Sequence, residues 1–85
     1  MDFPAYRRYS NGKSYFLVIN LNSMVEVQII GRYFTIHRLK AKILPERLLI
    51  SDILEAGNEH IERVSSEEYH AFLEACQKER EEKLF

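Results

Sequence analysis

Residues 6–20, YRRYSNGKSYFLVIN, decide the fold that the sequence predicts. Asn11-Gly12 stands between two segments rich in aromatic and β-branched residues. In that setting Asn-Gly is a strong signal for a β-hairpin, because a type I′ turn needs two residues with positive φ. Residues 15–19 are apolar at every position, as in a strand that is buried on both faces. The sequence therefore predicts an antiparallel sheet with residues 15–19 in a central strand.

Two further strands are expected after this hairpin. Residues 24–30 alternate between apolar and polar side chains, and Gly31-Arg32 then reverses the chain. In the next strand, apolar residues occupy even positions up to Ile36 and odd positions from Leu39 onward. Such a change of phase requires one extra residue, so the pattern predicts a β-bulge at His37-Arg38.

Residues 48–56 fit either a helix or a strand. As a helix, the segment has Pro45 near its first turn and Gly57 as a stop signal, but it lacks a good N-cap residue. As a strand, it turns at Gly57-Asn58 and pairs with residues 59–64. We favour the hairpin, preceded by a type I turn at residues 44–47.

A C-terminal helix has the clearest start signal in the chain. Residues 65–68, SSEE, form a capping box, in which Ser65 accepts a hydrogen bond from the backbone of Glu68. An apolar stripe follows at helical spacing, made by Tyr69, Phe72, Leu73 and Cys76. Beyond Cys76 the stripe fails, so the last turns are expected to be a solvated extension held by the pairs Glu74 with Lys78 and Glu79 with Lys83.

Together these elements predict one α+β domain that spans residues 1–85. Residues 1–64 are expected to form mainly an antiparallel β-meander of about five strands, and residues 65–84 a C-terminal helix packed on one face of that sheet. A chain of 85 residues has enough interior for a single core, which excludes a two-domain enzyme with a cleft between lobes.

The chain carries no signal for export or for a membrane. Cys76 is its only cysteine, so no intrachain disulfide is expected. The start is acidic rather than basic, and the longest apolar run is far too short to span a bilayer. We therefore expect a cytoplasmic protein without a membrane partner.

No motif in the chain points to an enzyme. Cys76 falls in the apolar stripe of the predicted helix, which favours a small buried hydrophobe over a nucleophile. His37, His60 and His70 fall on three different predicted elements, without Cys or His at zinc-ligand spacing nearby. The sequence thus predicts no catalytic residue, no metal and no cofactor.

Charge is distributed unevenly along the chain, although its formal net value is only −1. Residues 1–47 carry eight Lys/Arg and three Asp/Glu, whereas residues 48–85 carry four and ten. Seven of the ten aromatic residues also precede residue 35. A positively charged sheet face with rings on which bases stack is typical of single-stranded nucleic-acid binding. The residues that would form this face are Tyr6, Arg7, Arg8, Tyr9, Lys13, Tyr15, Arg32, Tyr33, Arg38, Lys40 and Lys42.

Nucleic-acid binding is the second hypothesis, and a small enzyme is the third because none of the required constellations is seen. Tyr and Phe in strands usually pack in a core, and Lys on a strand often guards a sheet edge against pairing. A core of this size rarely supplies more than about 3–5 kcal/mol, and oligomerisation is a common remedy. We therefore favour a non-enzymatic protein-interaction or structural module that forms a homodimer or binds another protein, with nucleic acid as the alternative.

Three stretches of the chain carry a resemblance to a known family. They are residues 9–16 (YSNGKSYF), 41–47 (AKILPER) and 66–69 (SEEY). Together they resemble a family of short, uncharacterised bacterial proteins, which implies a bacterial source and transfers no activity or site residue. In architecture alone, antiparallel strands closed by one C-terminal helix are similar to the repeat of Pur-type single-strand nucleic-acid binders, which pair two such repeats. That similarity supports the nucleic-acid alternative by analogy only.

Overall fold

A six-stranded sheet forms the centre of the protein in the computed structural model, which describes residues 3–55 and 60–83. Its elements follow the chain as β1 (Ala5–Tyr9), β2 (Ser14–Asn20), β3 (Ser23–Ile30), β4 (Tyr33–Lys40), α1 (Leu44–Leu54), β5 (Ile61–Arg63), α2 (Ser66–Glu79) and β6 (Glu81–Glu82). The strand order is β5-β1-β2-β3-β4-β6, and only β4 and β6 pair in parallel. The α+β class and the mostly antiparallel sheet are confirmed. The prediction of about five strands and one C-terminal helix differs in detail, because the described residues form six strands and two helices.

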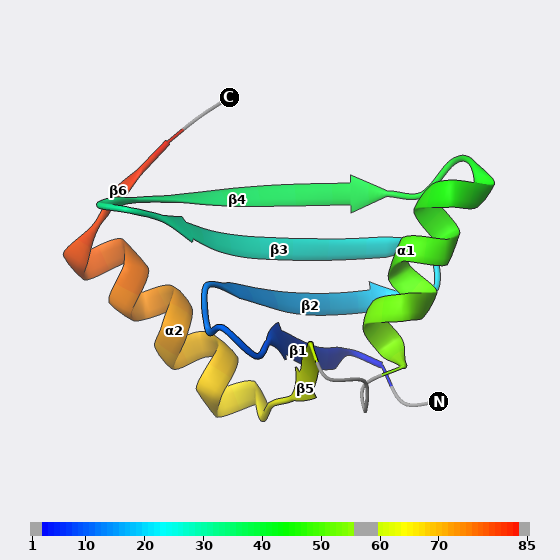
Figure 1. Cartoon of the computed structure of the whole chain (residues 1–85), viewed down its shortest axis with the longest axis horizontal. Coiled ribbons are helices and arrows are strands. Elements are labelled where there is room, and N and C mark those ends of the chain that lie inside the picture. The colour runs from blue at the N-terminus through cyan, green and yellow to red at the C-terminus, as the bar shows by residue number, and fades with distance from the viewer. Residues whose placement is uncertain (1–2, 56–59, 84–85) are drawn as a thin grey trace.

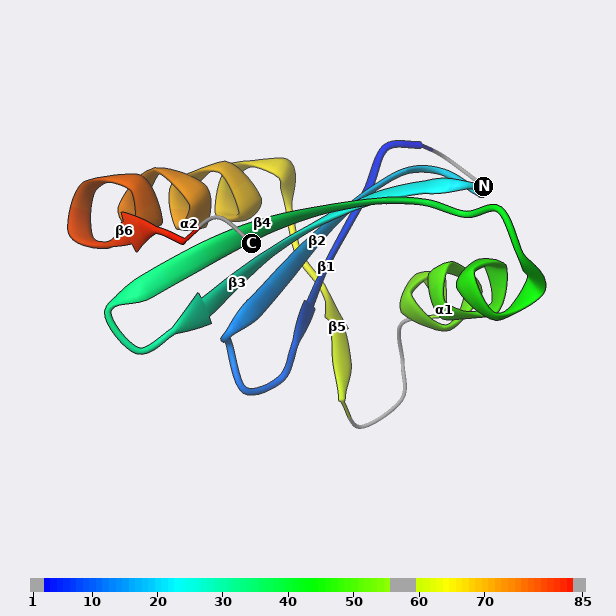
Figure 2. The ribbon, with the colours of Figure 1, turned by 90° about the horizontal axis from the view of Figure 1, so that it is seen from above.

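The two helices lie on opposite faces of the sheet and near opposite ends of its strands. Figure 1 shows α1 crossing one end of the central strands and α2 running across the other end. Figure 2, seen from above, shows α1 and α2 on opposite sides of the sheet. We call these sides the α1 face and the α2 face. Each helix covers only one part of its own face, so the core lies on different sides at the two ends of the strands.

This diagonal arrangement explains the change of apolar phase along β4. Phe34 and Ile36 belong to the core beneath α2, and Leu39 packs against the core beneath α1. Strands β3 and β4 pair residue for residue along their whole length without a register shift. The predicted bulge at His37-Arg38 is therefore wrong. The apolar positions change parity because the core changes sides along the strand, and the backbone needs no extra residue.

Helix α1 corrects the hairpin that the sequence favours at residues 48–56. The type I turn predicted at residues 44–47 is the first turn of this helix. In place of an N-cap side chain, Glu46 Oε1 accepts hydrogen bonds from the backbone N–H groups of Lys42 (2.9 Å) and Ile43 (3.2 Å). Packing against the sheet also stabilises the helix, because α1 contributes three buried side chains to the core: Ile50, Ile53 and Leu54.

Strand β5 has a different neighbour from the one predicted for residues 59–64. It pairs antiparallel with β1, with Tyr9 opposite Ile61, and forms one edge of the sheet. The predicted turn at Gly57-Asn58 lies outside the described residues. Residues 44–54 are helical, so they leave the edge of β1 open to β5.

Helix α2 begins as predicted and ends earlier. Ser65 Oγ accepts a hydrogen bond from the backbone N–H of Glu68 at 3.1 Å, which confirms the cap. The helix ends at Glu79, whereas the sequence predicts a helix over residues 65–84. Backbone pairing replaces the expected extension, because β6 joins the edge of β4 and Lys83 N–H donates to the Phe34 carbonyl at 2.8 Å. Leu84 and Phe85 lie outside the described residues.

The turn at Asn11-Gly12 connects β1 and β2 in the predicted hairpin, and β2 is central as expected. Gly12 has a positive φ of 73°, but Asn11 does not, so the predicted type I′ geometry is wrong. Asn11 Oδ1 instead accepts a hydrogen bond from Lys13 N–H at 2.8 Å, as in an Asx-turn. The tight reversal at Gly31-Arg32 is confirmed.

Candidate interaction surfaces

The eleven residues proposed for nucleic-acid binding are divided between the two faces and the turns. By strand register, the α2 face carries Tyr6, Arg8, Tyr15, Arg38 and Lys40, the α1 face carries Arg7, Tyr9 and Tyr33, Lys13 and Arg32 lie in turns, and Lys42 precedes α1. Successive side chains along a β-strand point to opposite faces of the sheet. Basic and aromatic residues that are neighbours in sequence therefore point to opposite sides of the sheet.

Three of the four tyrosines of this set are engaged in packing, and Tyr33 is half-buried with Lys83 Nζ 5.5 Å from the centre of its ring. Tyr15 is 9% exposed, and its ring stacks on Phe72 of α2 with 3.9 Å between centroids. The Tyr6 ring lies 5.3 Å from that of Tyr69. On the other face, Tyr9 meets Phe16 edge-on at 5.0 Å. Rings held in this way stabilise the two cores, and Tyr15 in particular offers almost no free surface on which a base could stack.

Two of the arginines are held by structural partners. Arg8 bonds Glu62 through Nε and Nη2, each at 2.9 Å, and bonds the Tyr15 hydroxyl through Nη1 at 3.2 Å. The hydrogen bond to Tyr15, followed by that to Glu62, raises the pKa of Arg8. Arg7 donates to the backbone carbonyls of Tyr6 and Leu54, and burial lowers its pKa. Arg8 thus ties β1 to β5, and Arg7 ties β1 to the end of α1.

Exposed cations remain at the end of the sheet that carries α1. Arg38 and Lys40 of β4 are exposed and line a groove of about 230 Å³ together with Ile19 and Val25. Lys42 is exposed just before α1, and Arg47 is exposed on the helix itself. None of these four cations forms an ion pair with a residue that the structure describes.

Most of the exposed large apolar side chains also gather at this end. Helix α1 and the residue before it contribute Ile43 (59% exposed), Leu44 (66%), Leu48 (54%) and Leu49 (43%), which we call the α1 apolar surface. Ile19 and Leu21 are exposed at the adjoining end of β2 and in the β2–β3 turn, where the carbonyl of Asn22 accepts from Ala41 N–H at 2.7 Å. Among the residues that the structure describes, Ile30 is the one exposed large apolar residue at the opposite end.

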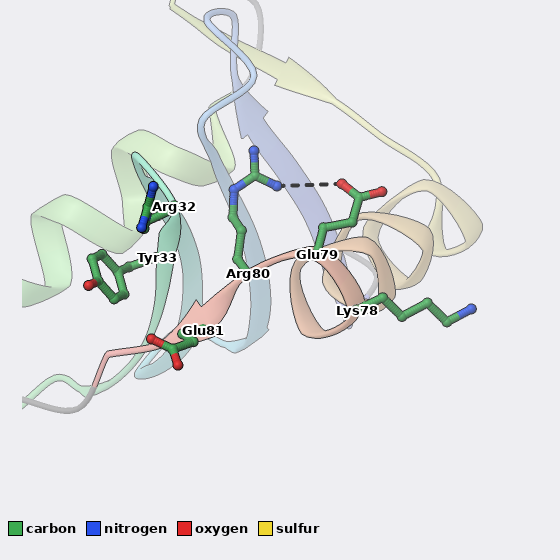
Figure 3. Close-up of a pocket in the computed structure, with 6 residues that line it drawn as sticks. All are labelled: Arg32, Tyr33, Lys78, Glu79, Arg80 and Glu81. Carbon is green, nitrogen blue, oxygen red and sulfur yellow. Dashed lines mark ion pairs between the residues drawn. The ribbon is translucent and has the colours of Figure 1, made fainter.

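A second depression lies where the β3–β4 turn meets the end of α2. It has a volume of about 510 Å³ and is lined by Arg32, Tyr33, Lys78, Glu79, Arg80 and Glu81. Figure 3 shows Arg80 turned toward Glu79, whereas Lys78 points away from the other side chains. Arg80 Nε donates to the Gly31 carbonyl at 3.2 Å, and Arg80 Nη1 lies 3.7 Å from Glu79 Oε2. Arg80 therefore anchors the end of α2 to the turn.

The described residues contain no group of three or more His, Cys, Asp or Glu side chains placed to hold a metal ion. Cys76 lies on the side of α2 that faces the sheet and is 1% exposed, and burial raises the pKa of its thiol. A raised pKa keeps the sulfur protonated near neutral pH, and the thiolate is the nucleophilic form. The position of Cys76 is that of a core residue.

Comparison of the chain with protein-family models, with curated proteins and with solved structures finds no match. Across residues 3–55 and 60–83, no helix has the length and apolarity needed to cross a membrane. Fold and surface define a small α+β domain with two helices placed diagonally on a six-stranded sheet and one apolar, cation-rimmed end.

Proposed function

We propose that the protein is a non-enzymatic interaction module that forms a homodimer through the α1 apolar surface. The observation that carries this proposal is the clustering of exposed large apolar side chains on one helix. Monomeric proteins rarely expose contiguous apolar patches larger than a few hundred Å², and larger patches mark interaction sites. Transferring apolar side chains from water to an interface contributes about 25 cal/mol per Å² buried, which compensates for a small core.

A comparison of the two sides of α1 supports this interpretation. On the inner side, Ile50, Ile53 and Leu54 are at most 4% exposed and pack against the sheet. Leu44 and Leu48 lie one helical turn apart, and both are more than half exposed. A helix that carries apolar residues on its outer side as well is typical of one that is covered twice, once by its own domain and once by a partner.

The test is the mass of the protein in solution as a function of concentration, measured by sedimentation equilibrium. We expect a reversible monomer–dimer equilibrium, and we expect Leu48→Glu to shift it to monomer while the far-UV circular dichroism is unchanged. Ile30→Glu is the matched control, because Ile30 is 44% exposed at the opposite end and its change should leave the equilibrium unaltered. A wild-type chain that stays monomeric up to about 1 mM would contradict the proposal.

Single-stranded nucleic acid remains the second hypothesis, and it now rests on fewer residues. The exposed cations Arg38, Lys40 and Lys42 lie near one another on the chain, but three of the four tyrosines proposed to stack bases are packed under α2 or against Phe16. The fourth, Tyr33, is half-buried at the opposite end of β4. Titration of a labelled oligonucleotide at low salt tests this hypothesis, because phosphate contacts give an affinity that falls steeply with salt. Absence of binding at low salt would remove it.

A further inference from the structure

We infer that the two copies pair their α1 helices in antiparallel orientation, so that Leu44 of each copy packs on Leu48 of the other and Asp52 lies beside Lys42 of the other. This inference rests on the proposed homodimer and specifies its geometry. It follows from the order of apolar and charged residues along the exposed side of α1.

The apolar residues of this surface are confined to the first half of the helix. Leu44, Leu48 and Asp52 follow one another at intervals of four residues, so they form a single stripe along the exposed side. At a rise of 1.5 Å per residue, Leu44 and Leu48 are about 6 Å apart along the helix axis. A two-fold axis between them places each leucine opposite the other leucine of the second copy, which is the self-complementary contact that a two-fold dimer requires.

Charge decides between the two orientations. Lys42 is held at the N-terminal end of α1, because its backbone N–H donates to Glu46 at 2.9 Å, and its side chain is exposed. The exposed carboxylate of Asp52 lies in the C-terminal half of α1, and that of Glu55, the C-cap residue, follows directly after it. A parallel pair would bring like charges together at both ends. An antiparallel pair places the acidic half of each helix beside the basic, dipole-positive N-terminal end of the other.

The first experiment reverses these charges in the full chain and measures the dimer dissociation constant by sedimentation. Lys42→Glu and Asp52→Lys should each raise that constant roughly 10-fold, because symmetry repeats every pair and each reversal turns attraction into repulsion. The combined variant K42E/D52K should return to within about 3-fold of wild type. Lys13→Glu changes an exposed lysine in the β1–β2 turn, at the end of the strands opposite α1 (Figure 1), and as the matched control it should have no effect.

The second experiment reads the orientation directly through cysteine cross-links in a Cys76→Ala background. Leu44→Cys and Leu48→Cys chains should cross-link efficiently when they are mixed and oxidised, and poorly when each is oxidised alone, because an antiparallel pair brings residue 44 near residue 48. Efficient self-cross-linking of either chain alone would overturn the inference in favour of a parallel pair.

The outcomes separate this inference from the proposed function. A dimer that Leu48→Glu dissociates, but that neither charge reversal weakens, retains the proposed function and overturns the antiparallel geometry. Two weakened single variants without recovery in K42E/D52K also overturn the pairing of Lys42 with Asp52. A wild-type chain that is monomeric throughout overturns both proposals.

Discussion

The two ends of this small sheet are covered by helices of different character. At one end, α2 covers its face with the rings of Tyr69 and Phe72, begins at a serine cap, and turns polar side chains toward solvent. At the other end, α1 covers its face with aliphatic side chains, begins without a side-chain cap, and leaves leucines on its outer side. The difference is that α2 buries its apolar side chains within one chain, whereas α1 leaves a second apolar side exposed, which is the side that we propose a second copy covers.

The largest effect is expected in the core beneath α2. Phe34 is 2% exposed in β4, and its replacement in Phe34→Ala should lower the free energy of unfolding by about 3–5 kcal/mol through lost burial and a cavity. Urea denaturation followed by circular dichroism measures the change. A loss below about 1 kcal/mol would mean that α2 is not held by this core, and the comparison between the two ends would fail.

The reactivity of the Cys76 thiol measures how often α2 opens away from the sheet. Since the thiol is 1% exposed and burial raises its pKa, its reaction with a disulfide reagent at pH 8 should require the native structure to open. We expect the native protein to react roughly 100-fold or more slowly than the chain in denaturant, which corresponds to an opening free energy of about 3 kcal/mol.

A cysteine at the exposed side of α1 provides the contrast. In a Cys76→Ala chain at a concentration where the monomer prevails, Ser51→Cys places the thiol on an exposed position of that helix, and it should react at nearly the unfolded rate. Equal protection of both thiols would show that the two ends do not differ in accessibility.

Substitutions at the N-caps of the two helices should change the free energy of unfolding by a smaller amount. Ser65→Ala removes the acceptor for Glu68 N–H and should cost about 1 kcal/mol. Ile43→Ser supplies α1 with the cap side chain that it lacks, and should add roughly 0.5–1 kcal/mol to the stability of the monomer. Both are measured by urea denaturation at a concentration where the monomer prevails. If Ile43→Ser destabilises the monomer, the Glu46 hydrogen bonds already provide an adequate cap.

The smallest effect is expected at the edge pair of β1 and β5. Arg8 and Glu62 are joined at 2.9 Å, but their side chains are 34% and 42% exposed. Solvent screening limits such a pair, so Glu62→Gln should lower stability by roughly 0.2–1 kcal/mol. Raising the salt concentration should reduce the difference between Glu62→Gln and wild type. A salt-independent loss above about 2 kcal/mol would show that the pair has a larger structural role.

Local patterns predicted several elements correctly because their signals are local. Asn11-Gly12 indicates the first hairpin, and Ser65 marks the start of α2, since turns and caps depend on residues within one or two turns of chain. The apolar stripe placed Cys76 in the core for the same reason. The predicted turn type was still wrong, because Asn11 Oδ1 accepts a hydrogen bond from Lys13 N–H and Asn11 does not adopt a positive φ.

Long-range packing accounts for the elements that the sequence predicts wrongly. Residues 48–56 are apolar on more than one side, a pattern that suits a buried strand as well as a helix covered twice. Composition alone selects the candidate nucleic-acid residues, and the strand register divides them between the two faces of the sheet. The α1 apolar surface was missed, although Leu44 and Leu48 at helical spacing were the available signal once residues 44–54 are taken as a helix.

By itself, the sequence determined the α+β class, the antiparallel hairpins, the start of α2 and the uneven charge of the two halves. These depend on interactions between near neighbours in the chain, which propensity and periodicity report directly. Tertiary structure decided the helical state of residues 44–54, the change of core side along β4, and the gathering of apolar residues at one end. These depend on which face of a twisted sheet each helix covers, and that choice is made by burial between residues far apart in sequence.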